Sequence, residues 1–152
     1  MTTMSLDTAA LMTVLPHRPP ILMVDRLDVA GDRRSAIGFK VIRPDEPCYL
    51  QTELTGSSAY PRALVVESLG QAAAALWLQR AAASGEDADS VGVLYFAKAE
   101  GVTFLGDVFP DDCLVHEVRL ERNVGPTAFM SSRTLCNGRV IAVVESIIAA
   151  AR

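Results

Sequence analysis

The chain has 152 residues, half of them hydrophobic, and a formal net charge of −4 at pH 7. This length suffices for one domain with its own core, and the negative charge argues against nucleic acid, whose phosphates attract basic surfaces. We expect a cytoplasmic protein, because no basic-then-apolar leader is present and the longest apolar stretch, Ala72–Leu78, is far shorter than the ~20 residues that cross a bilayer.

The N-terminal segment Met1–Met12 carries several apolar residues after a polar start. This pattern predicts a short helix, with Ser5 or Asp7 available as the N-cap. Residues Leu15–Pro20 cannot continue a helix, because each proline restricts the residue that precedes it.

Two strands and an irregular stretch are predicted next. The strands are Ile21–Ala30 and Ser35–Ile42, and Gly31-Asp32 between them is a hairpin signal. Residues Pro44–Tyr60 are polar and predict irregular structure.

A long helix is predicted at Pro61–Ser84. Proline is tolerated in the first turn of a helix, and the body of this one is apolar almost all round. A helix of that kind must be buried on most faces. Its small residues, Ala72–Ala75, allow a sheet to approach closely.

The remaining segments predict strands that follow an exposed loop at Glu86–Ser90. These strands are Val91–Ala99, Val102–Leu105, Leu114–Glu121, Ala128–Cys136 and Arg139–Ala149. Asn137-Gly138 is the strongest hairpin signal in the chain. An antiparallel sheet wrapped around one buried helix satisfies all of these elements. The sequence therefore predicts an α+β fold, in one domain over residues 1–152.

Cysteine and histidine are too scarce for a zinc site or a disulfide framework. Cys48, Cys113 and Cys136 lie far apart without a Cys-x-x-Cys pair, which is typical of free thiols in a reducing compartment. A zinc site needs more ligands than these and the two histidines, His17 and His116, provide. We expect no metal and no organic cofactor.

Three segments carry motifs. Residues 15–26 read LPHRPPILMVDR, residues 46–47 and 61–72 read EP and PRALVVESLGQA, and residues 108–114 read VFPDDCL. In this order and at similar spacing they resemble LPHRYPFLLVDR, EPFFxGHFPGxPxxPGVLxxEAMAQ and VVPGDQL of the bacterial 3-hydroxyacyl-[acyl-carrier-protein] dehydratases. The resemblance covers about residues 12–150 and implies the hotdog fold.

The resemblance also implies a reaction. In that family two chains pair so that their sheets run together, and each active site lies between subunits. A loop histidine of one chain takes the C2 proton of a 3-hydroxyacyl thioester, and a helix glutamate of the other handles the departing hydroxyl. A backbone N–H at the helix start polarises the thioester carbonyl. This implies fatty-acid or polyketide biosynthesis, with acyl carrier protein or coenzyme A thioesters as partners.

The resemblance assigns the helix glutamate to Glu67 and the glutamine one turn later to Gln71. Residues four apart share a helix face, so both side chains can point into one pocket. A carboxylate among apolar neighbours is costly to bury without partners. A glutamate satisfied by structural hydrogen bonds is the alternative interpretation.

The family's catalytic histidine position is occupied by Glu53, because GHFPG corresponds to Thr52-Glu53-Leu54-Thr55-Gly56. At the helix start the family's Pro-Gly is Pro61-Arg62, and the resemblance places substrate-binding backbone at Arg62 and Ala63. The Arg62 side chain projects where a glycine leaves room for the thioester. It is a candidate partner of Glu53 or Glu67.

Neither histidine is placed near Glu67 by the sequence. His17 falls on a non-catalytic histidine of the family, which implies a structural hydrogen-bonding role. His116 lies on a strand face with Leu114, Val118 and Leu120, which is typical of a packed or half-exposed sheet residue.

Three functions remain open. The chain is either a subunit that supplies Glu67 to a dehydratase site completed by a histidine-bearing hotdog partner, or a non-catalytic acyl-binding or partner-stabilising protein, or a hotdog enzyme that uses a carboxylate, as thioesterases do. Both homodimers and heterodimers fit. Leu105-Gly106-Asp107 replaces the family's usual Lys-Arg-Pro, so docking of a carrier protein at that edge is not expected.

Overall fold

The computed structural model describes residues 3–50, 58–85 and 94–151. The strands are β1 (Met4–Asp7), β2 (Arg26–Val29), β3 (Ser35–Val41), β4 (Leu94–Phe104), β5 (Cys113–Val124), β6 (Thr127–Cys136) and β7 (Arg139–Ala151). The helices are α1 (Thr8–Val14), α2 (Pro47–Leu50) and α3 (Arg62–Ala83).

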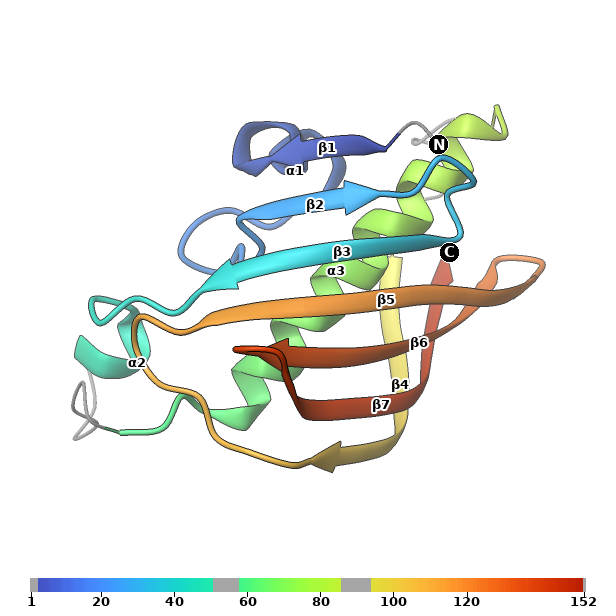
Figure 1. The fold of residues 1–152 in the computed structure, drawn as a ribbon. Coiled ribbons are helices and arrows are strands. Elements are labelled where there is room, and N and C mark those ends of the chain that lie inside the picture. Colours follow the sequence, from blue (N-terminus) through green and yellow to red (C-terminus); the bar gives the residue numbers. More distant parts are fainter. Residues whose placement is uncertain (1–2, 51–57, 86–93, 152) are drawn as a thin grey trace.

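One antiparallel sheet of seven strands, in the order β1-β2-β3-β5-β6-β7-β4, curves around α3 (Figure 1). The chain crosses from β3 near one edge to β4 at the other, and α3 makes this crossing along one face of the sheet. A long buried helix against an antiparallel sheet is the architecture that the sequence predicts.

The middle of α3 is buried on all sides, as its apolar sequence predicts. Every residue from Ser68 to Trp77 is buried. The sheet comes close because β3 presents Gly38 to the helix: a Cβ atom on Gly38 would lie 2.9 Å from the Cβ of Ala72. Two small residues thus set the helix-to-sheet distance at this crossing.

This close approach predicts a specific coupling. We expect Gly38→Ala to lower the free energy of unfolding by about 1–3 kcal/mol through overpacking, and Ala72→Gly to lower it by about 1 kcal/mol through helix propensity. The double variant should lose clearly less than the sum, because Ala72→Gly vacates the space that the new methyl group needs. Urea unfolding of the four proteins measures the coupling, and strictly additive losses would contradict the packing.

The predicted strands Val91–Ala99 and Val102–Leu105 correspond, over the described residues, to one continuous strand, β4, which ends at Phe104. Gly101 adopts φ of +61°, which glycine tolerates, and a register shift lies between Phe96 and Lys98. The pairing with β7 continues past both irregularities to Phe104. The sequence pattern predicts two strands because Gly101, a local irregularity within β4, looks like the end of a strand.

The N-terminal half departs further from the predicted elements. Met4–Asp7 is a strand rather than helix, because it pairs with β2, and the helix α1 starts only after Asp7, which caps it by accepting a hydrogen bond from Ala10 N–H. Residues 21–25, which the sequence predicts as the start of a strand, lie outside β2. The short helix α2 interrupts the stretch predicted as irregular. None of the helices in the described ranges is long and apolar enough to cross a membrane.

Candidate active site

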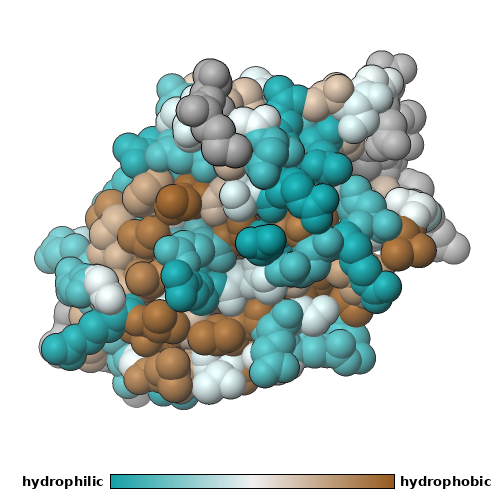
Figure 2. Space-filling model, turned by 45° about the vertical axis from the view of Figure 1, so that its right-hand side comes forward, coloured by the Kyte–Doolittle hydropathy of each residue, from teal (hydrophilic) through white to brown (hydrophobic). Residues whose placement is uncertain are grey.

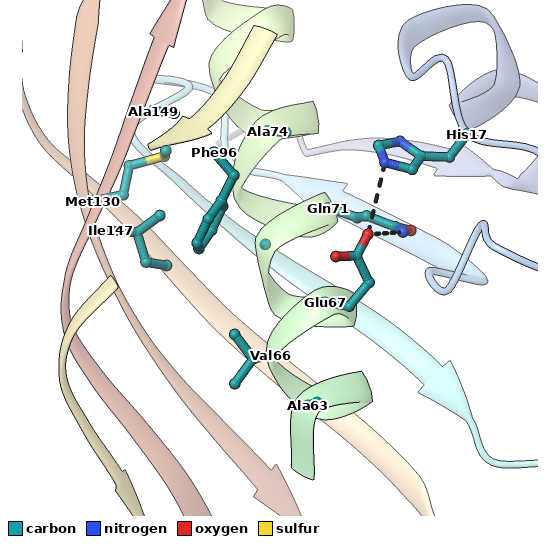
Figure 3. Close-up of a pocket in the computed structure, with 11 residues that line it drawn as sticks. His17, Ala63, Val66, Glu67, Gln71, Ala74, Phe96, Met130, Ile147 and Ala149 are labelled. Carbon is teal, nitrogen blue, oxygen red and sulfur yellow. Dashed lines mark hydrogen bonds and ion pairs between the residues drawn. The ribbon is translucent and has the colours of Figure 1, made fainter. Parts of the chain in front are cut away.

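A cavity of about 270 Å³ lies beside the first half of α3. It is bounded by α3, by residue His17 of the loop after α1, and by strands β4, β6 and β7 (Figure 3). Its walls are mostly apolar: Ala63, Val66, Gly70, Ala74, Phe96, Met130, Ile147 and Ala149. The polar side chains of the lining are His17, Glu67 and Gln71. An apolar cavity with a few convergent polar groups is the usual form of a small-molecule site.

Glu67 and Gln71 share one face of α3, as their spacing predicts. Gln71 Nε2 donates a hydrogen bond of 2.8 Å to Glu67 Oε1. The Glu67 side chain is 46% exposed, so its carboxylate stands at the open side of the cavity rather than in the core. It is therefore accessible to a ligand.

Gln71 itself is buried and is held at both ends of its amide. Its Oε1 accepts from Met23 N–H at 2.7 Å, and its Nε2 also donates to the Ile21 carbonyl at 2.7 Å. One turn earlier, Ser68 donates from its hydroxyl to the Met23 carbonyl at 2.6 Å. Two helix side chains thus form hydrogen bonds with the backbone of residues 21–23. These backbone groups are then not available for strand pairing, which explains why β2 does not begin earlier.

His17 lies next to Glu67, with 3.7 Å between His17 Nε2 and Glu67 Oε1. The loop that carries it is closed by Arg18, whose guanidinium donates to the carbonyls of Leu15 and His17. Sequence reasoning missed this proximity, because the loop reaches α3 through contacts between residues 45 or more apart. The signal that could have found it is the prolines on both sides of His17, which fix a rigid loop directly before the segment bound to α3.

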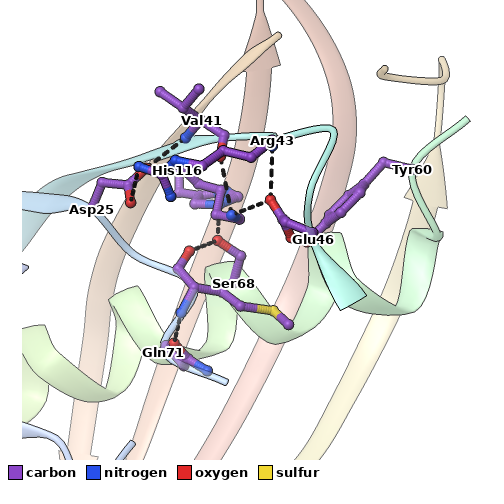
Figure 4. A network of polar contacts seen from close by, with 10 residues as sticks. Asp25, Val41, Arg43, Glu46, Tyr60, Ser68, Gln71 and His116 are labelled. Atoms are coloured by element: carbon purple, nitrogen blue, oxygen red, sulfur yellow. Dashed lines mark hydrogen bonds and ion pairs between the residues drawn. The ribbon is translucent and has the colours of Figure 1, made fainter. Parts of the chain in front are cut away.

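A buried polar network lies on the other side of the Met23 segment (Figure 4). His116 Nε2 lies 2.8 Å from Ser68 Oγ, and His116 Nδ1 lies 2.8 Å from Thr134 Oγ1. Because the Ser68 hydroxyl donates to Met23, it accepts from His116 Nε2–H, and Thr134 then donates to His116 Nδ1. Both hydroxyls and the imidazole are fully buried, so this arrangement is structural and not an exposed nucleophile with its base.

Lys40 extends the network toward α2. Its ammonium group, almost fully buried, contacts Glu46 at 2.6 Å and the Val41 carbonyl at 3.0 Å. Tyr60 donates to the other oxygen of Glu46 at 2.7 Å. Burial alone would raise the pKa of the Glu46 carboxyl, but hydrogen bonds from Lys40, Arg43 N–H and Tyr60 together lower this pKa below its usual value.

The buried imidazole predicts acid sensitivity. Burial, with a smaller contribution from the Lys40 charge, lowers the pKa of His116 to about 3 from its ordinary 6.5. Between these values the unfolded chain binds a proton that the folded chain does not. The stability is thus fully present above pH 6.5 and falls as the pH drops toward about 3.

We expect this group to remove about 2 kcal/mol of stability between pH 7 and pH 5. Denaturant unfolding at the two pH values measures the loss, and His116→Gln, which does not titrate, supplies the reference. The loss in the variant should be smaller by that amount. An equal loss in both proteins would show that His116 is not kept neutral by the fold.

The other sequence-predicted site residues have different placements. Ala63 lines the cavity. Arg62 points elsewhere: its guanidinium pairs with Asp107 at 3.2 Å and lies over the Phe104 ring, 5.1 Å from its centroid. Glu53 lies outside the described residues.

Comparison with known proteins decides the family. Residues 15–145 match the model of the FabA-like domain. The 3-hydroxyacyl-[acyl-carrier-protein] dehydratase FabZ of Acidiphilium cryptum is 34% identical over 146 residues, 96% of this chain and 84% of that protein. FabZ of Polynucleobacter necessarius is 34% identical over 122 residues, 80% of this chain and 77% of that protein. This chain belongs to the FabA-like family.

Solved structures confirm the hotdog fold of this family member. The dehydratase heterocomplex ApeI:P from Xenorhabdus doucetiae matches with a TM-score of 0.74 over 93% of this chain and 90% of that chain, at 14% identity. The dehydratase domain of RzxB from Pseudomonas fluorescens matches with a TM-score of 0.67 over 97% of this chain and 49% of that chain, at 13% identity. At such identities the likeness shows the fold alone.

Proposed function

We propose that this chain supplies Glu67 to a site that dehydrates 3-hydroxyacyl thioesters. The observation that carries the proposal is the placement of Glu67: a carboxylate clamped by Gln71 at the open side of an apolar cavity. The apolar walls suit an acyl chain, and the carboxylate suits the hydroxyl-bearing carbon near its thioester end. The FabZ relatives support this substrate class.

In the proposed reaction, a base takes the proton from C2 of the acyl group. The electron pair of that C–H bond forms the C2–C3 double bond, and the C3–O bond breaks. Glu67, in its protonated form, gives its proton to the departing hydroxyl, so that water leaves and a 2-enoyl thioester remains. General acid catalysis of this kind contributes about 10²–10⁴-fold to a rate.

The base, in our proposal, comes from a histidine-bearing homologue, because Glu53 stands at this chain's own histidine position. Such sharing requires that the two chains meet near the cavity. The edge strand β4 is suited to this. It pairs only with β7 among the described residues, and Tyr95, Phe96 and Val102 on it are 50%, 47% and 39% exposed.

A long exposed edge strand is a template for pairing with another chain. Because Phe96 of β4 also lines the cavity, a strand paired to β4 would lie beside the site. Figure 2 shows hydrophobic residues exposed between hydrophilic ones on one face of the molecule, so apolar surface remains for contacts between subunits. ApeI:P is a dehydratase heterocomplex, which supports a mixed assembly for this chain.

The role of Glu67 is testable by mass spectrometry of 3-hydroxybutyryl and 3-hydroxydecanoyl thioesters. We expect enoyl product from the chain mixed with a histidine-bearing homologue, and a loss of about 100-fold or more with Glu67→Gln, since the amide cannot donate a carboxyl proton. Glu121→Gln, an exposed carboxylate outside the cavity, is the matched control. Acyl binding without turnover, unaffected by Glu67→Gln, would instead indicate an acyl-binding protein.

The assembly through β4 is tested separately by light scattering. We expect Val102→Arg to shift the complex toward single chains, because it places a charge at the centre of an apolar contact between strands. Val124→Arg is the control, since Val124 is 56% exposed at the end of β5, away from β4. Equal masses for both variants and the unmodified chain would contradict this interface.

A further inference from the structure

The contacts of Glu67 distinguish its two oxygens. Gln71 Nε2 donates to Oε1, and His17 Nε2 faces the same oxygen at 3.7 Å. The second oxygen points away from both partners, toward the apolar side of the cavity (Figure 3). The two partners also come from different directions, Gln71 from the same helix and His17 from the loop opposite.

We propose that His17 is a positioning residue that fixes the Glu67 carboxylate, so that Oε2 is the oxygen that exchanges a proton with the substrate. The inference rests on the proposed function and refines it. One hydrogen bond, from Gln71 to Oε1, restrains the carboxylate but tolerates some rotation about its terminal bond. His17 faces the same oxygen at 3.7 Å from another direction and narrows that rotation.

Fixing the carboxylate matters because Glu67 is half-exposed. A glutamate side chain with that much solvent access samples several rotamers, and ordering it has an entropic cost. A contact with His17 lowers the entropy that Glu67 loses on binding substrate, because it orders the carboxylate beforehand. His17 can do this because its own loop is held by Arg18 and by the hydrogen bonds of residues 21–23 to α3. A misplacement of about 1 Å in a reacting group can lower a rate by about 10²-fold.

The surroundings of His17 favour this role over that of the catalytic base. Its Nδ1 is buried and has no hydrogen-bond partner among the described residues. A base that takes a proton at Nε2 becomes an imidazolium ion, whose Nδ1–H must then be satisfied. A buried unsatisfied N–H is costly, and more so in a charged group. A neutral imidazole that turns Nε2–H toward Glu67 leaves an uncharged acceptor at Nδ1, which costs less to bury than a charged N–H.

The test compares two variants in the mixture with the histidine-bearing homologue. His17→Leu removes the donor, whereas the amide of His17→Gln can still reach Glu67. We expect His17→Leu to lower kcat about 10–100-fold with KM changed less than about threefold. His17→Gln should recover most of kcat and keep the pH profile of the unmodified protein. Arg139→Gln, at the exposed first residue of β7, is the control.

Two outcomes would overturn the inference. Unchanged kcat in His17→Leu would show that Glu67 needs no second contact. A His17→Gln variant as slow as His17→Leu, with one limb of the pH profile lost, would show that His17 itself transfers the proton. Thermal unfolding of each variant separates these results from a failure to fold.

If the unmodified mixture gives no enoyl product, the proposed function fails, but the positioning by His17 is still measurable. Carbon-13 NMR follows the Glu67 carboxyl resonance, which is assigned by its disappearance in Glu67→Gln. In His17→Leu this resonance should shift and broaden relative to the unmodified chain, because the carboxylate loses its second contact. A resonance with the same position and width in both proteins would overturn the inference independently of any activity.

Discussion

The candidate site depends on the attachment of residues 21–23 to α3. Ser68 and Gln71 hold the carbonyl and the N–H of Met23, and Gln71 also holds the Ile21 carbonyl. Side-chain hydrogen bonds to buried backbone are costly to lose, because each leaves an unsatisfied group. Since this one contact orders both Gln71 and the loop before Ile21, it places the two partners of Glu67 at once. The geometry of the cavity is thus a consequence of how the N-terminal motif packs on the helix.

The polar interior on the far side of this contact has an energetic cost of its own. His116 and Lys40 are buried within the sheet and helix, where an apolar pair would pack without desolvation. Lys40 donates to Glu46 and to the Val41 carbonyl, and both ring nitrogens of His116 have partners. The chain of bonds from Thr134 through His116 to Ser68 has only one consistent set of donors. Directional bonds of this kind accept one register between helix and sheet. Apolar contacts, such as that of Ala72 with Gly38, set the distance but not the register.

The sequence predicted what depends on local periodicity. The long helix and its shared Glu67–Gln71 face follow from the 3.6-residue repeat, and the β6–β7 hairpin follows from Asn137-Gly138. It failed where long-range contacts override the local pattern. β1 is a strand only because β2 is beside it, and His17 reaches Glu67 only because residues 21–23 bind α3. The direction of Arg62 toward Asp107 likewise depends on a residue 45 positions away.

The electrostatic character of the cavity explains how its wall can hold a carboxylate beside apolar side chains. A carboxylate beside apolar walls is tolerated when polar groups hold one of its oxygens, and Gln71 and His17 both face the same one. The second oxygen then stays directed at the cavity, where a substrate hydroxyl can replace water as its partner. A base on the same wall would compete with the substrate for that oxygen. In the function we propose, a base delivered across β4 by another chain avoids that competition and stays apart from Glu67 until the acyl group lies between them.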